Sequence, residues 1–137
     1  AAAGVLRAFA PSACTDVSGF GLAGHLLEML RAGDVGARLD LAAVPLLDGA
    51  VECVAAGMLS SLHSSNLRFA ADAGPGRGHT HALMFDPQTA GGLLAALPAA
   101  SAERCLDELR GAGYPDAAIV GTVTETQASR PTLVLEG

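Results

Sequence analysis

Asp16 is the carboxylate around which chemistry can be built in this sequence. It lies in CTDVSGFGLAGHLLEML (residues 14–30), where a short polar stretch leads into apolar residues spaced three and four apart, the spacing of one helix face. Gly19, Gly21 and Gly24 fall on the first turns of that helix, where unpaired backbone N–H groups attract anions. Mg²⁺ typically binds one or two protein carboxylates together with substrate phosphates, so this combination of groups suits a magnesium-phosphate site.

Two other interpretations fit the same residues. Asp16 and Ser18 are residue types that cap helix N-termini, an effect of about 1 kcal/mol, and the glycines can serve close helix packing. GFGLAG (residues 19–24) also has the G-x-G-x-x-G spacing of a dinucleotide-binding turn, with Asp40 downstream. That turn requires a buried apolar strand running into the first glycine. The polar residues before Gly19 therefore disfavour nicotinamide binding.

A second segment with unusual backbone requirements is FDPQTAGGLL (residues 85–94). The aspartate before its proline is pushed toward extended geometry, so the chain is expected to turn there. Its paired glycines indicate either a tight turn or the close approach of another group to the backbone. Just upstream, His79 and His81 could bind a metal. Without a further ligand nearby in sequence, they are expected to be solvated loop residues.

The two segments together resemble the C-terminal motifs of selenophosphate synthetase, the selenide, water dikinase family. The resemblance is carried by TDVSGFGL followed by GHLLEM, and by FDPQTAGGLL, and it extends through VPLL (residues 44–47), Asn66 and IVGTV (residues 119–123). It covers only the C-terminal domain of that enzyme, whose superfamily is that of aminoimidazole ribonucleotide synthetase. The chain also begins without Met, in what resembles a helix already under way. Residues 1–137 are therefore expected to be a single C-terminal domain of a larger two-domain synthetase, with the N-terminal ATP-binding domain absent from this chain.

The resemblance implies an activity and roles for four residues. The family makes selenophosphate from selenide, ATP and water, with release of AMP and phosphate, using Mg²⁺. Asp16 matches the family's metal-binding aspartate, Gly19 and Gly21 would bring backbone amides close to phosphate, and Thr15 would orient the turn. The family's catalytic cysteine or selenocysteine and its partner lysine have no counterpart here. No catalytic residue is therefore expected in this chain, and the isolated domain is expected to be inactive.

Two departures from the family pattern are visible, and two alternatives stay open. Ser18 stands where the family usually has Thr, which keeps the hydroxyl, whereas Ala90 replaces a usual Ser and loses it. The implied partners are the chain's own N-terminal domain, selenide and a second copy in a homodimer. The alternatives are a non-catalytic binding or assembly module, marked by a contiguous apolar patch, and another ATP-dependent enzyme of the same superfamily.

Composition narrows the class of protein. The chain has 137 residues and a mass of 13.6 kDa, and 50% of its residues are hydrophobic. This is enough for one domain with an aliphatic core. A net charge of −6 with only eight basic residues argues against a nucleic-acid partner. The sequence has neither a signal peptide nor an apolar run of the roughly 18 residues that a membrane span needs. Its three cysteines form no C-x-x-C pair and are read as reduced thiols of a cytoplasmic protein.

The elements that must position the motifs are predicted from periodicity and turn residues. Helices are expected over residues 1–10, 20–31, 46–56 with Pro45 at the first position, and 60–71, and in a segment capped by Ser101 that ends at Gly111 or Gly113. Extended segments or strands are expected over residues 13–17, 35–41, 83–85, 93–97, 117–124 and 132–136. Residues 73–81 are expected to be a loop, and residues 130–131 a hairpin-like return. This order predicts an α/β fold with a mixed sheet covered by helices, as the resemblance to the aminoimidazole ribonucleotide synthetase-like C-terminal domain also implies.

Overall fold

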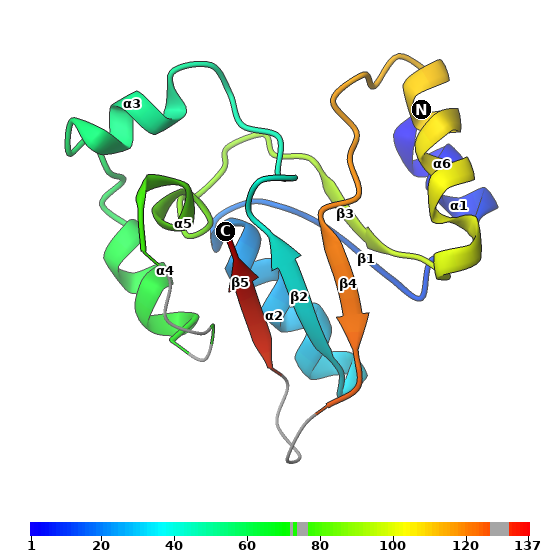
Figure 1. The fold of residues 1–137 in the computed structure, drawn as a ribbon, viewed down its shortest axis with the longest axis horizontal. Helices are drawn as coiled ribbons and strands as arrows, with labels where there is room; N and C mark the ends of the chain where they lie inside the picture. The colour runs from blue at the N-terminus through cyan, green and yellow to red at the C-terminus, as the bar shows by residue number, and fades with distance from the viewer. Residues whose placement is uncertain (72, 74–76, 127–131) are drawn as a thin grey trace.

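A computed structural model describes residues 1–71, 73, 77–126 and 132–137 (Figure 1). Within these residues six helices and five strands follow one another in mixed order, so the predicted α/β architecture is confirmed. In this part of the chain no helix combines the length and apolar character needed to cross a membrane.

The described strands form two sheets with three strand pairings. Strand β1 (Ala13–Asp16) pairs antiparallel with β3 (Leu93–Ala96). The second sheet has the order β4-β2-β5, in which β2 (Gly36–Asp40) runs antiparallel to β4 (Gly121–Thr124) and parallel to β5 (Leu133–Glu136). The predicted mixed sheet is therefore present, with β2 at its centre.

The predicted hairpin-like return at residues 130–131 lies outside the described residues. The strands on either side of it are not hydrogen-bonded to each other, because β2 lies between β4 and β5. The turn residues therefore did not indicate which strands pair: β4 and β5 run in opposite directions, one on each side of β2.

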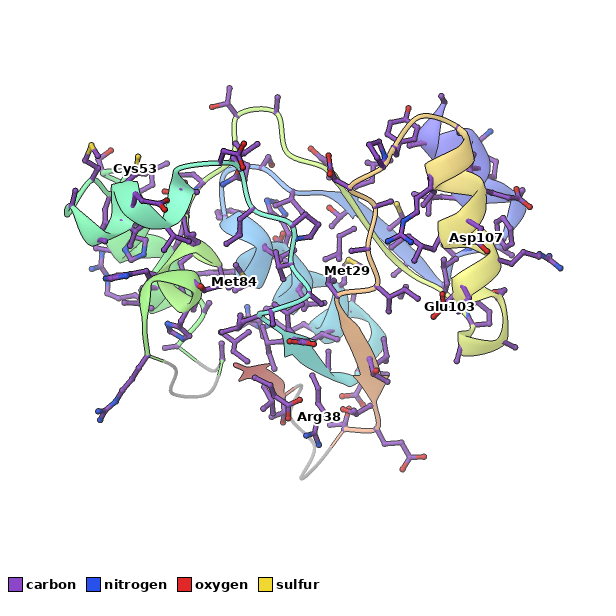
Figure 2. All side chains as sticks on the ribbon, turned by 45° about the horizontal axis from the view of Figure 1, so that its top comes forward. Met29, Arg38, Cys53, Met84, Glu103 and Asp107 are labelled. Carbon is purple, nitrogen blue, oxygen red and sulfur yellow. The ribbon has the colours of Figure 1, made fainter. Side chains whose placement is uncertain are left out.

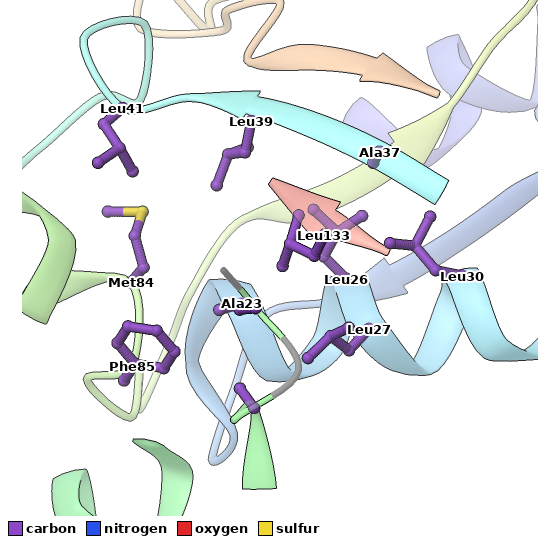
Figure 3. Packing of buried hydrophobic residues seen from close by; sticks show 12 residues of the cluster. Ala23, Leu26, Leu27, Leu30, Ala37, Leu39, Leu41, Met84, Phe85 and Leu133 are labelled. Atoms are coloured by element: carbon purple, nitrogen blue, oxygen red, sulfur yellow. The ribbon is translucent and has the colours of Figure 1, made fainter. Parts of the chain in front are cut away.

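The main core forms where helix α2 (Gly21–Gly33) packs on one face of the three-stranded sheet (Figure 3). Its apolar side chains recur with the predicted helical spacing, and the buried ones are Ala23, Leu26, Leu27 and Leu30. They meet Ala37 and Leu39 of β2 and Leu133 of β5. Burying each leucine stabilises the fold by roughly 1.5–3 kcal/mol. The helix that carries the first motif is therefore anchored by its entire apolar face.

A smaller core joins helices α1 (Ala2–Ala8) and α6 (Ala99–Gly111) on the opposite side of β4 from β2 (Figure 1). Leu6, Phe9 and Cys105 are its buried members, and Ala95 and Leu97 from the β3 region pack against them. This cluster attaches the two helices to the β1–β3 ladder.

A helical arm, consisting of α3 (Ala50–Ala55), α4 (His63–Phe69) and α5 (His79–Leu83), lies at the other end of the molecule (Figure 1). Helices α3 and α5 bury no residue, and α4 buries only Asn66. The arm is therefore joined to the core mainly through the residues that follow α4 and α5.

Several predicted boundaries were wrong. The loop prediction fails at residues 79–81, which belong to α5 (His79–Leu83), and residues 83–85 are helical or turn rather than extended. The glycine-rich composition upstream concealed one short helical turn. The helix predicted to open at Pro45 starts only at Ala50, because Gly49, at φ +81°, is the residue that redirects the chain.

The predicted capping residues were also wrong. Helix α6 begins at Ala99, so Ser101 lies inside its first turn and its hydroxyl donates to the carbonyl of Pro98. Asp16 belongs to β1, and the N-cap of α2 is Phe20. Helix α2 runs to Gly33, two residues beyond its predicted end, and its C-cap is Asp34 in the left-handed conformation, at φ +49°.

Candidate functional site

Antiparallel pairing of β1 with β3 brings the two sequence motifs to the same end of one ladder. Asp16 ends β1 directly opposite Leu93, which begins β3. One further bond, from the Val17 N–H to the Gly92 carbonyl at 2.9 Å, extends the pairing into both motifs. A Cβ on Gly91 would collide with the carbonyl oxygen of Val17. Gly91 thus serves a close approach of backbone to backbone, one of the two predicted meanings, whereas no atom lies within 4 Å of the Cβ position of Gly92.

The turn after Asp16, residues 17–20, is called the motif turn below. It is bonded to residues 84–92, which overlap the FDPQTAGGLL segment and are called the second segment from here on. The Ser18 carbonyl accepts the N–H of Gln88 at 2.9 Å and that of Gly21 at 3.1 Å. The Met84 carbonyl accepts the N–H of Ala23 at 2.9 Å. Two amides at the start of α2 are therefore satisfied by carbonyl groups of the protein itself.

The three motif glycines have different surroundings. Gly21 has φ +69°, and a Cβ there would lie 2.8 Å from the Met84 carbonyl oxygen and 2.9 Å from that of Asp86. At Gly24 a Cβ would lie 2.6 Å from the Cβ of Phe20, whereas no atom comes within 4 Å of the corresponding position at Gly19. Packing accounts for Gly21 and Gly24, and Gly19 alone of the three faces open space.

Asp16 itself presents an exposed carboxylate at the end of β1, and the Thr15 hydroxyl donates to its backbone carbonyl at 3.2 Å. No group of three or more His, Cys, Asp or Glu side chains that could hold a metal occurs among the described residues. One exposed carboxylate fits Mg²⁺ as a single ligand, because this ion keeps waters and takes its remaining ligands from phosphates and few protein groups.

The strand before the glycines does not suit a dinucleotide. Strand β1 is only partly covered and runs antiparallel to its one partner. A dinucleotide-binding turn follows a buried strand of a parallel sheet. The geometry therefore agrees with the sequence argument against nicotinamide binding.

Asn66 is the first site residue to which sequence reasoning gave no role. It is 4% exposed, and its side-chain nitrogen donates to the Gly19 carbonyl at 2.9 Å and to the Phe85 carbonyl at 3.0 Å. One amide group thus contacts both motifs. The available signal was a polar residue in the predicted helix 60–71 that also belonged to the family resemblance.

His25 is the second missed residue, and it holds the motif turn from within α2. Its ring is buried, with Nε2 3.4 Å from the Phe20 N–H and 3.2 Å from the Ser18 hydroxyl, and Nδ1 3.2 Å from a carboxylate oxygen of Glu28. Because a backbone N–H can only donate, Nε2 is the acceptor and the proton lies on Nδ1, facing Glu28. The Ser18 hydroxyl, which a threonine at this position would also supply, therefore has His25 as its hydrogen-bond partner.

An aromatic stack joins the motif turn to the helical arm. The Phe20 ring lies 5.2 Å from that of Phe69 with an interplanar angle of 18°, and the Arg31 guanidinium lies 5.1 Å from the centre of the Phe69 ring. Phe20 remains 43% exposed. This contact places α4, and with it Asn66, beside the turn.

His81 is not the solvated loop residue that the sequence predicted. It belongs to α5, and its ring lies 5.0 Å from that of Phe85, while His79 is exposed. Its Nε2 is buried and has no hydrogen-bond partner among the described residues. Burial, and secondarily the charge of His63, lower the pKa of His81. The His81 ring therefore packs against Phe85, and its lowered pKa favours the neutral form.

Comparison with known proteins gives a family and several relatives. The profile of the family described as "AIR synthase related protein, C-terminal domain" matches residues 2–134. Selenide, water dikinase of Agathobacter rectalis is 38% identical over 123 residues, covering 87% of this chain and 36% of the relative. The enzyme of the same name from Trichlorobacter lovleyi is 45% identical over 106 residues, covering 74% and 31%, and that of Pelobacter propionicus is 38% identical over 133 residues, covering 94% and 38%.

The chain thus spans about a third of the length of the curated relatives that it matches. The matched part includes both motifs and Asn66, which lie within residues 2–134. What the remaining two thirds of those relatives contribute has to come from outside this sequence.

Proposed function

We propose that this chain is the C-terminal domain of a selenide, water dikinase, because it belongs to the family of C-terminal domains of AIR synthase related proteins. The whole enzyme would convert selenide, ATP and water into selenophosphate, AMP and phosphate. The observation that carries the proposal is the meeting of both motifs at one end of the β1–β3 ladder, with Asp16 exposed there.

In this proposal Asp16 contributes one ligand to Mg²⁺, and the open backbone at Gly19 faces the phosphates of ATP. Bound Mg²⁺ would offset the negative charge on phosphate oxygens during transfer. Thr15 holds the backbone at Asp16 through its hydroxyl. Gly21 lets α2 start against the backbone of the second segment. Because its N–H is bonded to the Ser18 carbonyl, the proposed role of Gly21 is to shape the turn near the phosphates.

The remaining ligands and the reacting groups would come from an N-terminal domain of the same enzyme. One carboxylate cannot hold Mg²⁺ tightly by itself, so the isolated chain is expected to bind ATP weakly and to catalyse nothing. A homodimer of the full enzyme and selenide as its substrate belong to the same proposal. So does a cytoplasmic location, whose reducing conditions suit the three free thiols of Cys14, Cys53 and Cys105.

The test is Asp16→Asn in the full-length enzyme, which keeps the size of the side chain and removes its charge. Selenide-dependent AMP formation should be lost while the unfolding midpoint stays unchanged. Asp107→Asn is the matched control, because Asp107 is an exposed carboxylate on α6, a helix that carries neither motif (Figure 2). Full turnover by Asp16→Asn would refute the metal-ligand role.

A second candidate is an assembly module, favoured by exposed apolar side chains in and around the helical arm. Leu47, Met58 and Leu62 are 81%, 60% and 51% exposed. Such a module would bind a partner protein without affinity for Mg²⁺ or ATP, which calorimetric titration of the full-length protein measures directly. Another substrate within the superfamily would instead appear as ATP cleavage that does not depend on selenide.

A further inference from the structure

We propose that Asn66 is a positioning residue that locks the motif turn to the second segment, so that Asp16 is presented from one rigid unit. The inference rests on the proposed function for its consequence in catalysis, but its structural part stands by itself. Its basis is the pair of bonds from a single side-chain nitrogen to the carbonyls of Gly19 and Phe85.

The carbonyl groups of Gly19 and Phe85 share one donor group, the side-chain nitrogen of Asn66. Asn66 is 4% exposed, and its amide NH₂ group supplies two N–H donors, one for each carbonyl. Since both partners are acceptors, nitrogen rather than oxygen must occupy this end of the amide. Loss of the donor would leave the carbonyl oxygens of Gly19 and Phe85 without these hydrogen bonds.

Within the motif turn, Gly19 depends on Asn66 more than Ser18 and Phe20 do. Ser18 and Phe20 are also held by His25, through the hydroxyl of the first and the backbone N–H of the second. Gly19, between them, has no atom near its Cβ position, and its carbonyl is bonded to Asn66. The residue that faces open space is therefore fixed from the opposite side by Asn66.

The second segment is fixed by the same side chain. Phe85 is 1% exposed, and its ring packs in the main core (Figure 3), while its carbonyl accepts a hydrogen bond from Asn66. Three residues later, Gln88 donates its N–H to the motif turn at Ser18. Asn66 thus closes a ring of contacts that runs from Gly19 through α4 to Phe85 and returns through Gln88.

Helix α4 brings Asn66 to this place by packing at two further positions. Phe69 stacks on Phe20, and Ala70, just past the helix, is buried in the main core. The spacing from residue 66 to residues 69 and 70 is three and four, so the three side chains lie on one helix face. That shared face explains how a helix with few buried residues can position one amide accurately.

The experiment uses the full-length enzyme with Asn66→Asp, which keeps the shape of the side chain and replaces its donors by acceptors. The Mg²⁺ concentration for half-maximal AMP formation should rise about 10-fold or more, the usual loss when a group supporting a metal ligand is removed. Ser65→Ala is the neighbouring control and should change nothing, because among the described residues its hydroxyl bonds to the Leu62 carbonyl at the N-cap of the same helix and to no other group.

A second control separates positioning from stability. Leu106→Ala truncates a buried side chain of α6, a helix that carries neither motif, so it should lower the unfolding midpoint without moving the Mg²⁺ requirement. If Asn66→Asp also lowers the midpoint and leaves the Mg²⁺ requirement at its wild-type value, the positioning role is refuted.

Hydrogen exchange of the same variants tests the structural part independently of activity. In Asn66→Asp the amides of Val17, Ala23 and Gln88 should exchange faster together, whereas Leu106→Ala should leave their relative protection unchanged. If the wild-type enzyme forms no AMP from ATP and selenide, the proposed function fails, and this exchange result alone decides the inference. Unchanged protection at these amides would overturn it.

Discussion

The main core and the helical arm flank the same motif turn, but different forces hold them. In the main core, Ala23 and Leu27 are fully buried and Leu30 is 2% exposed. In the arm, α3 and α5 bury nothing, and α4 meets the turn through one amide and one aromatic stack. The motif turn therefore has a rigid apolar side and a side fixed by a few directional contacts. We expect stability to depend on the first and the shape of the site on the second.

The largest difference between the two regions should appear when leucines are truncated. Leu27→Ala removes a fully buried side chain and should destabilise the protein by about 2–5 kcal/mol. Leu47→Ala, at a position 81% exposed beside the arm, should change stability by less than about 0.5 kcal/mol. Urea unfolding followed by far-UV circular dichroism measures both. Equal effects would remove the distinction between core and arm.

Two glycines with positive φ give the next largest contrast. Gly21→Ala places a methyl group against the backbone of the second segment as well as straining φ, so about 2–5 kcal/mol should be lost. Gly49→Ala, where φ is +81° and space is open, should lose only about 1 kcal/mol. The same unfolding experiment applies. A smaller loss at Gly21 than at Gly49 would mean that α2 can shift away from Met84.

The arm should respond to acid through His81. Because the folded protein lowers the pKa of His81, the unfolded chain binds more protons between that pKa and the ordinary value of 6.5. The corresponding stability is complete above pH 6.5 and is lost as the pH falls through the folded pKa. Urea midpoints at pH 7.5 and pH 5 should differ less in His81→Gln than in the wild type. His79→Gln, at an exposed position, is the control and should retain the wild-type pH dependence.

The smallest expected effect concerns the thiols. Cys53 on α3 (Figure 2) and Cys14 on β1 are exposed and should react at once with a thiol reagent. Cys105 is 1% exposed, and burial, with the charge of Glu108 as a lesser cause, raises the pKa of its thiol. It should react only after unfolding. Counting modified thiols by mass spectrometry checks this, and a third fast-reacting thiol would show that the α1–α6 cluster opens readily.

Much of the scaffold follows from local sequence patterns. The helical spacing of α2 and the alternation along residues 35–41 identify the elements of the main core, because burial of one face imposes a period on the sequence. Composition predicts the aliphatic character of that core. The motif residues likewise point to Asp16 and Gly19 without any knowledge of the fold. Each of these features depends only on residues that are close together in the sequence or on overall composition.

The assembly of the site was decided only by tertiary structure. The bonds from Asn66 to Gly19 and Phe85 span 47 and 19 residues, and no local period predicts such pairs. The role of Gly21 depends on the backbone of a segment more than 60 residues away. Composition also gave no sign of α5, since its helical turn is short and follows a glycine-rich stretch. Side-chain periodicity records which face is buried, whereas a hydrogen bond between distant segments depends on where the whole chain brings its donors and acceptors together.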